Sequence, residues 1–290
     1  MRFDWYSGTP RDRPERVLDA LVSLLSSSVE GFEITRHPGT QGYEFEDRMI
    51  DGLGTRVFGL LHGGHNSVPH VRSSGIYSPL AASALRQAYP DHTVSRADVA
   101  IDFCGPSAWN ILRQSCELVA TGRNLKWAVL GDDRPEGVRD PSQGRTLYVG
   151  SRQSPVFIRC YEKGLHEASK GISYGPDGLP PSPDWVRVEC EVKPPNRLAK
   201  ARAARLSPEQ FWGCSPGSRA ILSRILSVDV ERITMTEHRK PDYERALLHA
   251  AVQYRSACEK LIDANGGDPS SLIRFFQTVW VQMDEHRQSA

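Results

Sequence analysis

Runs of alternating apolar and polar side chains occupy much of this 290-residue chain before residue 206. Alternation with a period of two predicts β-strands that turn one face toward a core, and turns containing Gly or Pro separate most of the runs. The expected strands are Phe32–Thr35, Tyr43–Met49, Arg56–Leu61, His70–Ser73, Val94–Phe103, Arg145–Gly150, Val156–Glu162 and Trp185–Lys193.

Apolar positions spaced by three or four residues predict helices in other segments. The expected helices are Pro14–Val29, Leu80–Ala88, Pro106–Thr121, Arg219–Val228, Asp242–Asn265 and Ser270–Met283. The chain therefore predicts an α+β fold, with a curved antiparallel sheet in residues 1–205 and a helical C-terminal region in residues 206–290. The helix-and-strand pattern before residue 90 recurs in outline after it, which indicates an internal duplication by shape alone.

The amino-acid composition is that of an ordinary globular protein and does not by itself indicate a function. The chain is 39% hydrophobic and 24% charged, and no apolar run approaches the roughly 20 residues that span a bilayer. The N-terminus lacks the apolar core of a signal peptide, so we expect a cytoplasmic protein. A net charge of +1 does not decide whether nucleic acid is a partner. The basic run Arg197–Arg205 is either a solvated helix face or a DNA contact.

Three expected strands carry charged or hydroxyl side chains at alternate positions, which places each set on one face of its strand. A solvated sheet face can have this pattern without any chemistry. Its occurrence in three strands favours a functional site. The three sets are Arg96, Asp98 and Asp102; Arg159, Tyr161 and Lys163; and Arg187, Glu189, Glu191 and Lys193.

Carboxylates gathered on one face repel one another unless a cation lies among them. Oxygen ligands alone select a hard divalent ion, Mg²⁺ or Mn²⁺. The expected metal ligands are Asp98, Asp102, Glu189 and Glu191, the last on strand parity alone.

The phenol of Tyr161 has an ordinary pKa near 10, so it needs the metal or a neighbouring cation to attack as phenoxide. Arg159 and Lys163 flank it on the same face, and Arg96 and Arg187 add cations that can bind or neutralise a phosphate. Attack on a phosphodiester would leave a 5′-phosphotyrosine and a free 3′-hydroxyl.

At these residues the chain resembles the replication initiation factor family, which includes initiators of rolling-circle plasmids, filamentous-phage replication proteins and relaxases of some integrative elements. The resemblance covers roughly residues 1–205. The matching segments are Arg96–Asp102 with the pattern RxDxAxD, Thr146–Arg152, Ile158–Lys163 and Trp185–Glu189, with weaker matches at Asp4–Ser7 and Val71–Gly75.

The resemblance implies a fold of two related sheet-and-helix halves, with Tyr161 as the nicking nucleophile and Asp98, Asp102 and Glu189 as metal ligands. The implied function is a rolling-circle DNA replication initiator that nicks one strand at an origin. Expected partners are origin DNA, as a hairpin or a single strand, a host helicase and polymerase, and a second copy of the chain as a homodimer, with no membrane. The alternatives are a relaxase, a nuclease in which water attacks, and a non-catalytic DNA-binding regulator.

Overall fold

The structure is a computed structural model that describes residues 1–134, 138, 140, 142–171, 181–235 and 250–288. The chain divides into two compact units, Met1–Thr236 and Glu237–Ala290. The segment from residue 206 to 235 thus packs with the sheet, although the sequence groups it with the C-terminal helices. The assignment of nicking to residues 1–205 stays a prediction.

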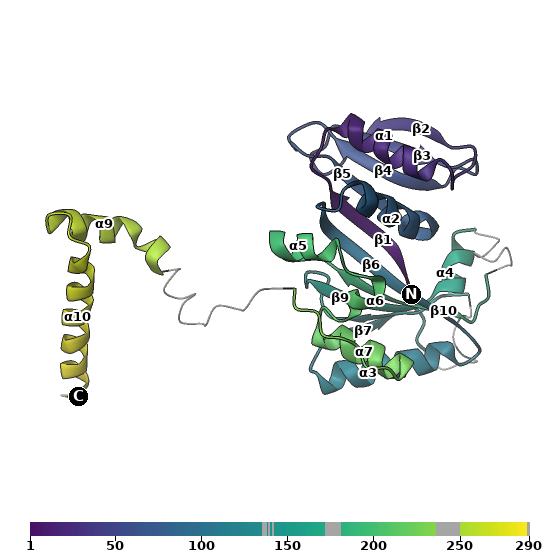
Figure 1. The fold of residues 1–290 in the computed structure, drawn as a ribbon. Helices are drawn as coiled ribbons and strands as arrows, with labels where there is room; N and C mark the ends of the chain where they lie inside the picture. The colour runs from purple at the N-terminus through teal and green to yellow at the C-terminus, as the bar shows by residue number, and fades with distance from the viewer. Residues whose placement is uncertain (135–137, 139, 141, 172–180, 236–249, 289–290) are drawn as a thin grey trace. The chain divides into compact units, whose positions relative to one another are not determined.

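One open sheet of ten antiparallel strands forms the centre of the first unit (Figure 1). The strand order is β2-β3-β4-β5-β1-β6-β10-β9-β8-β7. The expected antiparallel α+β fold is therefore confirmed. The strands are β1 (Arg2–Thr9), β2 (Glu33–Pro38), β3 (Phe45–Ile50), β4 (Arg56–His62), β5 (His70–Ser74), β6 (Thr93–Cys104), β7 (Trp127–Leu130), β8 (Thr146–Val149), β9 (Val156–Glu162) and β10 (Trp185–Val192).

The sheet consists of two halves with the same topology. In each half a central strand leads through a helix to the sheet edge, and four strands then return to the centre. Strands β1 to β5 repeat as β6 to β10, and helix α1 (Pro14–Leu25) repeats as α3 (Ala108–Gly122). The two central strands, β1 and β6, pair antiparallel and join the halves. The internal duplication indicated by the sequence is present in the fold.

Helices cover one face of the sheet and enclose the core. Helices α1 and α2 (Ser78–Ala88) lie on the first half, and α3, α5 (Arg197–Ala203) and α6 (Pro208–Trp212) lie on the second, with α7 (Pro216–Leu226) packed on α3. The core-facing residues of the strands, such as Val99 and Val188, are fully buried. Helix α6 begins at a capping box between Ser207 and Gln210 and buries Phe211 and Trp212 completely.

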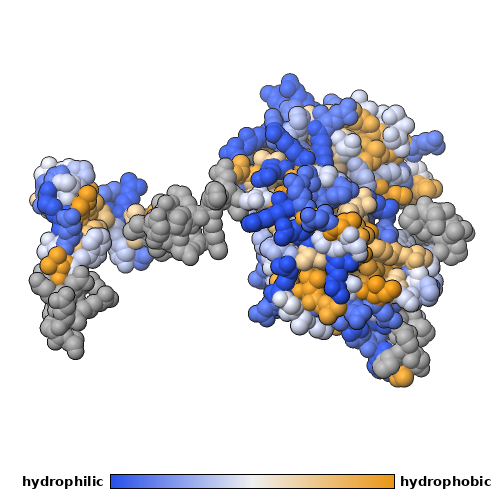
Figure 2. Space-filling model, turned by 60° about the horizontal axis from the view of Figure 1, so that its bottom comes forward, coloured by the Kyte–Doolittle hydropathy of each residue, from blue (hydrophilic) through white to orange (hydrophobic). Residues whose placement is uncertain are grey.

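The second unit consists of α9 (Arg255–Ala264) and α10 (Ser270–Gln288), which contact each other. The first part of the expected helix Asp242–Asn265 lies outside the described residues. Large apolar side chains are exposed in this unit (Figure 2), among them Val252, Ile273, Phe276 and Trp280. No described helix is long and apolar enough to cross a membrane.

Two elements near the candidate site depart from the sequence prediction. Strand β1 was not expected, because its alternation is broken by a bulge between Phe3 and Trp5. The segment Lys163–Ser169 forms a short helix, α4, between β9 and β10. Both departures change which side chains reach the polar face of the sheet.

The two buried aromatic residues of α6 generate a prediction about the extent of the folded unit. A chain ending at Arg205 lacks Phe211 and Trp212, and loss of one large aromatic core side chain typically costs about 3–5 kcal/mol of the free energy of unfolding. Because whole domains have only about 5–15 kcal/mol, this chain should show no cooperative thermal transition. A chain ending at Met235 is the control and should unfold cooperatively. Equal melting curves for the two chains would contradict the assignment of α6 to the core.

Candidate active site

The face of the sheet opposite the core helices carries the three sets of polar residues. Cross-strand register places Arg187 beside Tyr161 and Asp102, and it places Glu189 beside Arg159. Asp98 lies opposite Glu191. A groove of about 770 Å³ opens on this face. Its lining includes Asp98, Arg159, Tyr161, Arg187 and Glu189, together with Asp4, Trp5, His166 and Glu167, but neither Asp102 nor Glu191. The alternation in the sequence therefore predicts correctly which side chains share this face.

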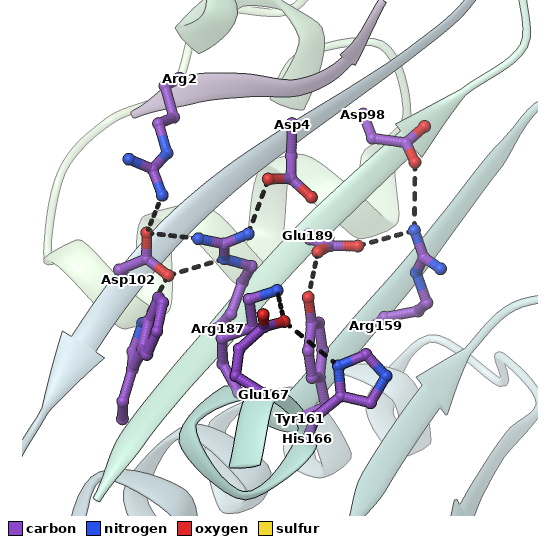
Figure 3. A network of polar contacts seen from close by, with 12 residues as sticks. Arg2, Asp4, Asp98, Asp102, Arg159, Tyr161, His166, Glu167, Arg187 and Glu189 are labelled. Atoms are coloured by element: carbon purple, nitrogen blue, oxygen red, sulfur yellow. Dashed lines mark hydrogen bonds and ion pairs between the residues drawn. The ribbon is translucent and has the colours of Figure 1, made fainter. Parts of the chain in front are cut away.

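The hydroxyl of Tyr161 points at the carboxylate of Glu189 (Figure 3). It donates a hydrogen bond to Glu189 Oε1 at 2.5 Å. Glu189 is 2% exposed. Burial raises the pKa of Tyr161 well above its ordinary value, and the charge of Glu189 raises it further. Tyr161 is therefore a protonated phenol in direct contact with a base.

One guanidinium joins the carboxylates of Glu189 and Asp98. Arg159 Nη2 lies 2.6 Å from Glu189 Oε2 and 3.1 Å from Asp98 Oδ2. Arg96 holds Asp98 from the other side, with its Nε 2.8 Å from Asp98 Oδ1. Burial raises the pKa of both Asp98 and Glu189, because it outweighs the effect of the neighbouring arginines. Both carboxyl groups therefore hold a proton more readily than exposed ones do.

Arg187 organises a second ion cluster on the other side of Tyr161. It is 2% exposed and donates to both oxygens of Asp102, at 2.7 and 2.9 Å, and to Asp4 Oδ1 at 2.6 Å. Arg2 and the indole N–H of Trp185 also donate to Asp102. The hydrogen bonds and charge of Arg187 outweigh burial and lower the pKa of Asp102. Asp102 is therefore a partner of Arg187 and is turned away from Glu189.

The bulge in β1 brings Asp4 to this cluster. At the bulge, the step from Phe3 to Trp5 spans only Val99 to Asp98 on the partner strand, so Asp4 is the extra residue. Sequence reasoning did not select Asp4, although its segment is one of the weaker family matches. A bulge changes the face on which a side chain lies, so alternation along the strand cannot predict the position of Asp4.

The remaining expected residues lie farther from the Tyr161 hydroxyl. Glu191 pairs with Arg96 at 2.9 Å and with Lys193 at 2.5 Å. Lys163 begins α4, pairs with Glu167, and has its ammonium 5.9 Å from the centre of the Tyr161 ring. His166, which the sequence did not indicate, makes an edge contact with that ring at 5.7 Å between centroids. Burial lowers the pKa of His166.

The described carboxylates in the groove offer a divalent ion fewer than three protein ligands. Among the described residues, no three His, Cys, Asp or Glu side chains come together as a metal-binding group. Asp98 and Glu189 are the expected ligands that line the groove, whereas Asp102 and Glu191 are not among its lining residues. Mg²⁺ is commonly held by one or two carboxylates together with water and substrate phosphates. A carboxylate in the groove fits such a site.

Comparisons with known proteins bear on the same residues. Residues 92–211 match the model of a family described as replication initiation factor, so the resemblance seen in the sequence is confirmed over this segment. Among solved structures, a rolling-circle replication initiator protein from Geobacillus stearothermophilus is 18% identical, with a TM-score of 0.48, and the match covers 82% of this chain and 88% of that one. No curated protein sequence matches significantly.

The Arg187 cluster generates a prediction about stability. Arg187→Met leaves Asp4 and Asp102, which are partly exposed, without their main cation, and a hydrogen bond to a charged group typically contributes about 1.5–3 kcal/mol. Denaturation in urea should give this loss as a lower transition midpoint. Arg16→Gln, which removes an exposed ion pair with Asp12, is the control and should cost about 0–1 kcal/mol. A midpoint for Arg187→Met within the range of the control would contradict the prediction.

Proposed function

We propose that this chain, whose residues 92–211 match the replication initiation factor family, is a rolling-circle replication initiator that nicks one DNA strand through Tyr161. The observation that carries the proposal is the hydrogen bond from the Tyr161 hydroxyl to Glu189, in a groove with cations on both sides. A phenol, an adjacent base and guanidinium groups are what a transesterification at phosphorus requires.

The proposed reaction is a single transfer. The Tyr161 oxygen bonds to the phosphorus, and its proton passes to Glu189, whose raised pKa makes it a stronger base than an ordinary carboxylate. The bond between phosphorus and the 3′-oxygen breaks, and that oxygen takes a proton from water and leaves as a 3′-hydroxyl. The 5′-phosphate stays on Tyr161. Rejoining runs the same bonds in reverse, with Glu189 returning the proton to Tyr161.

The arginines have two different roles in this scheme. Arg159 and Arg187 lie on either side of Tyr161 and would hold the negative charge that develops on the transferred phosphate. Asp4 and Asp102 fix Arg187 in place, so both act as positioning residues. Asp98 would hold Mg²⁺ or Mn²⁺ together with water and phosphate oxygens, and the ion when bound would polarise a phosphoryl oxygen, whereas Glu189 acts as the base.

Tyr161→Phe tests the nucleophile. The wild-type chain should form a detergent-stable adduct with the 5′ side of a nicked origin oligonucleotide, and the variant should form none while binding the DNA with unchanged affinity. The measurement is gel analysis of end-labelled DNA with Mn²⁺ or Mg²⁺ present. Nicking by Tyr161→Phe without an adduct would instead favour attack by water. Binding without nicking by the wild-type chain would favour a non-catalytic regulator.

Glu189→Gln tests the base. Because the pKa of Glu189 is raised, the wild-type nicking rate should fall as the pH drops through that value, above the ordinary carboxylate pKa of about 4.3. The variant should lose this pH dependence and nick about 10²- to 10⁴-fold more slowly. Glu191→Gln is the matched control, because Glu191 lies two residues along the same strand face without contacting Tyr161. An unchanged pH profile in Glu189→Gln would count against the proposed base.

Asp98→Asn tests the metal site. The variant should raise the Mn²⁺ or Mg²⁺ concentration for half-maximal nicking by at least about tenfold, the effect of losing even an outer hydrogen-bonding partner of a metal ligand. Asp102→Asn should leave this concentration unchanged, because Asp102 is turned toward Arg187. The opposite ranking of the two variants would replace Asp98 by Asp102 as the ligand.

A further inference from the structure

A second polar cluster lies on the first half of the sheet, on the same face as the candidate active site. At its centre Glu46 is completely buried and receives three arginines. Arg48 donates twice to Glu46 Oε2, at 2.9 and 2.6 Å; Arg72 approaches Oε1 at 2.8 Å, and Arg56 approaches it at 3.5 Å. Three arginines surround one carboxylate, so these four side chains together carry a net positive charge.

Two of these arginines belong to a row that crosses the sheet toward the active site. Register pairs Arg48 with Gly59, Gly59 with Arg72, Arg72 with Ser7, and Ser7 with Arg96. An arginine thus occurs on every second strand, at intervals of roughly 10 Å given the usual spacing of neighbouring strands. The residues between them, Gly59 and Ser7, are small, and the side chain of Arg72 is 17% exposed. The side chains of Arg48, Arg56 and Arg96 are each about 30% exposed.

The cluster occupies the position that the active site has in the other half. Strands β4 and β9 have equal length, and aligning their ends places Leu61 at the position of Tyr161 and Gly59 at that of Arg159. By register, Arg72 then corresponds to Glu189. This half therefore has a leucine where the second half has its proposed nucleophile, and a cation where the second half has its proposed base.

The active-site groove reaches the edge of the cluster. Thr55 and Ser74 line the groove. Thr55 directly precedes Arg56, and Ser74 is the last residue of β5, the strand that contains Arg72. At the other end of the row, Arg96 lies over the ring of Trp5, which also lines the groove, at 4.8 Å. A chain of phosphates that enters the groove can continue onto the arginine row without leaving the polar face.

We propose that Arg48, Arg56 and Arg72 form a non-catalytic binding track for the phosphodiester backbone of DNA, which leads across the first half of the sheet to the active site. Glu46 holds the three guanidinium groups in place and prevents their mutual repulsion. The identity of the ligand as DNA rests on the proposed function, whereas the site itself rests on the cluster and its register.

The test is the salt dependence of DNA binding by the double variant Arg48→Gln, Arg56→Gln. Arg72 is kept, so Glu46 retains a close cation in the folded protein. Fluorescence anisotropy is measured on the full chain without divalent metal, using labelled single-stranded and duplex oligonucleotides. Each lost phosphate contact should reduce the slope of log K against log salt by about 0.7 for a single strand or about 0.9 for a duplex. The form of DNA whose slope falls is the one on the track.

Two further variants separate binding from structure. Arg48→Lys, Arg56→Lys keeps both charges and should retain the wild-type slope, whereas a purely structural role of the guanidinium forks would not be rescued by lysine. Arg36→Gln removes an arginine that pairs with Asp47 on the helix-covered side and should change nothing. An unchanged slope in the glutamine double variant overturns the track alone. Failure of the wild-type chain to bind either DNA overturns the track and the proposed function together.

Discussion

Compensation of buried carboxylates by arginines across one face of an open sheet is the constraint on which this protein depends. A buried carboxylate costs several kcal/mol unless a cation and further hydrogen bonds replace its water. Asp98 and Glu189 are such carboxylates, and the guanidinium of Arg159 contacts both. Burial nevertheless raises the pKa of both, so either can accept a proton more readily than an exposed carboxylate. Asp4 and Asp102 are partly exposed, and the three donor nitrogens of the buried Arg187 hold them in place. The division between scaffold and chemistry follows from which carboxylates are buried.

The alternation of polar and apolar residues along single strands predicted which side chains of the candidate site share a face. It predicted that Arg96, Asp98 and Asp102 share a face, and the same holds for Arg159 with Tyr161 and for Arg187 with Glu189, because parity is a local property of a strand. Alternation could not predict that Arg187 forms an ion pair with Asp102, or that Glu191 forms ion pairs with Arg96 and Lys193. Those pairings depend on register between strands far apart in the sequence. Asp4 was missed because a bulge breaks the period of two. Lys163 lines the groove as expected, but it does so from the first residue of a helix, which alternation does not predict.

The repeated topology explains why an extensive sheet can carry one site and a different cluster at equivalent positions. Each half offers the same polar face, bounded by the same order of strands, and the central pair β1 and β6 joins the two faces. The second half places a phenol and its base on that face, whereas the first places three arginines around Glu46. The family match begins at residue 92 and therefore covers the half with the tyrosine, while the first half lies outside it.

Gly59 shows how the two halves differ at one pair of equivalent positions. A side chain added there would place its Cβ 2.3 Å from Glu46 Oε1, so the missing side chain at the position of Arg159 is what makes room for the buried carboxylate. An arginine at residue 59 would therefore require Glu46 to move, and moving Glu46 would leave three guanidinium groups in mutual repulsion. The two halves are thus not interchangeable by single substitutions, because packing around Glu46 excludes the side chain that the second half has at the equivalent position.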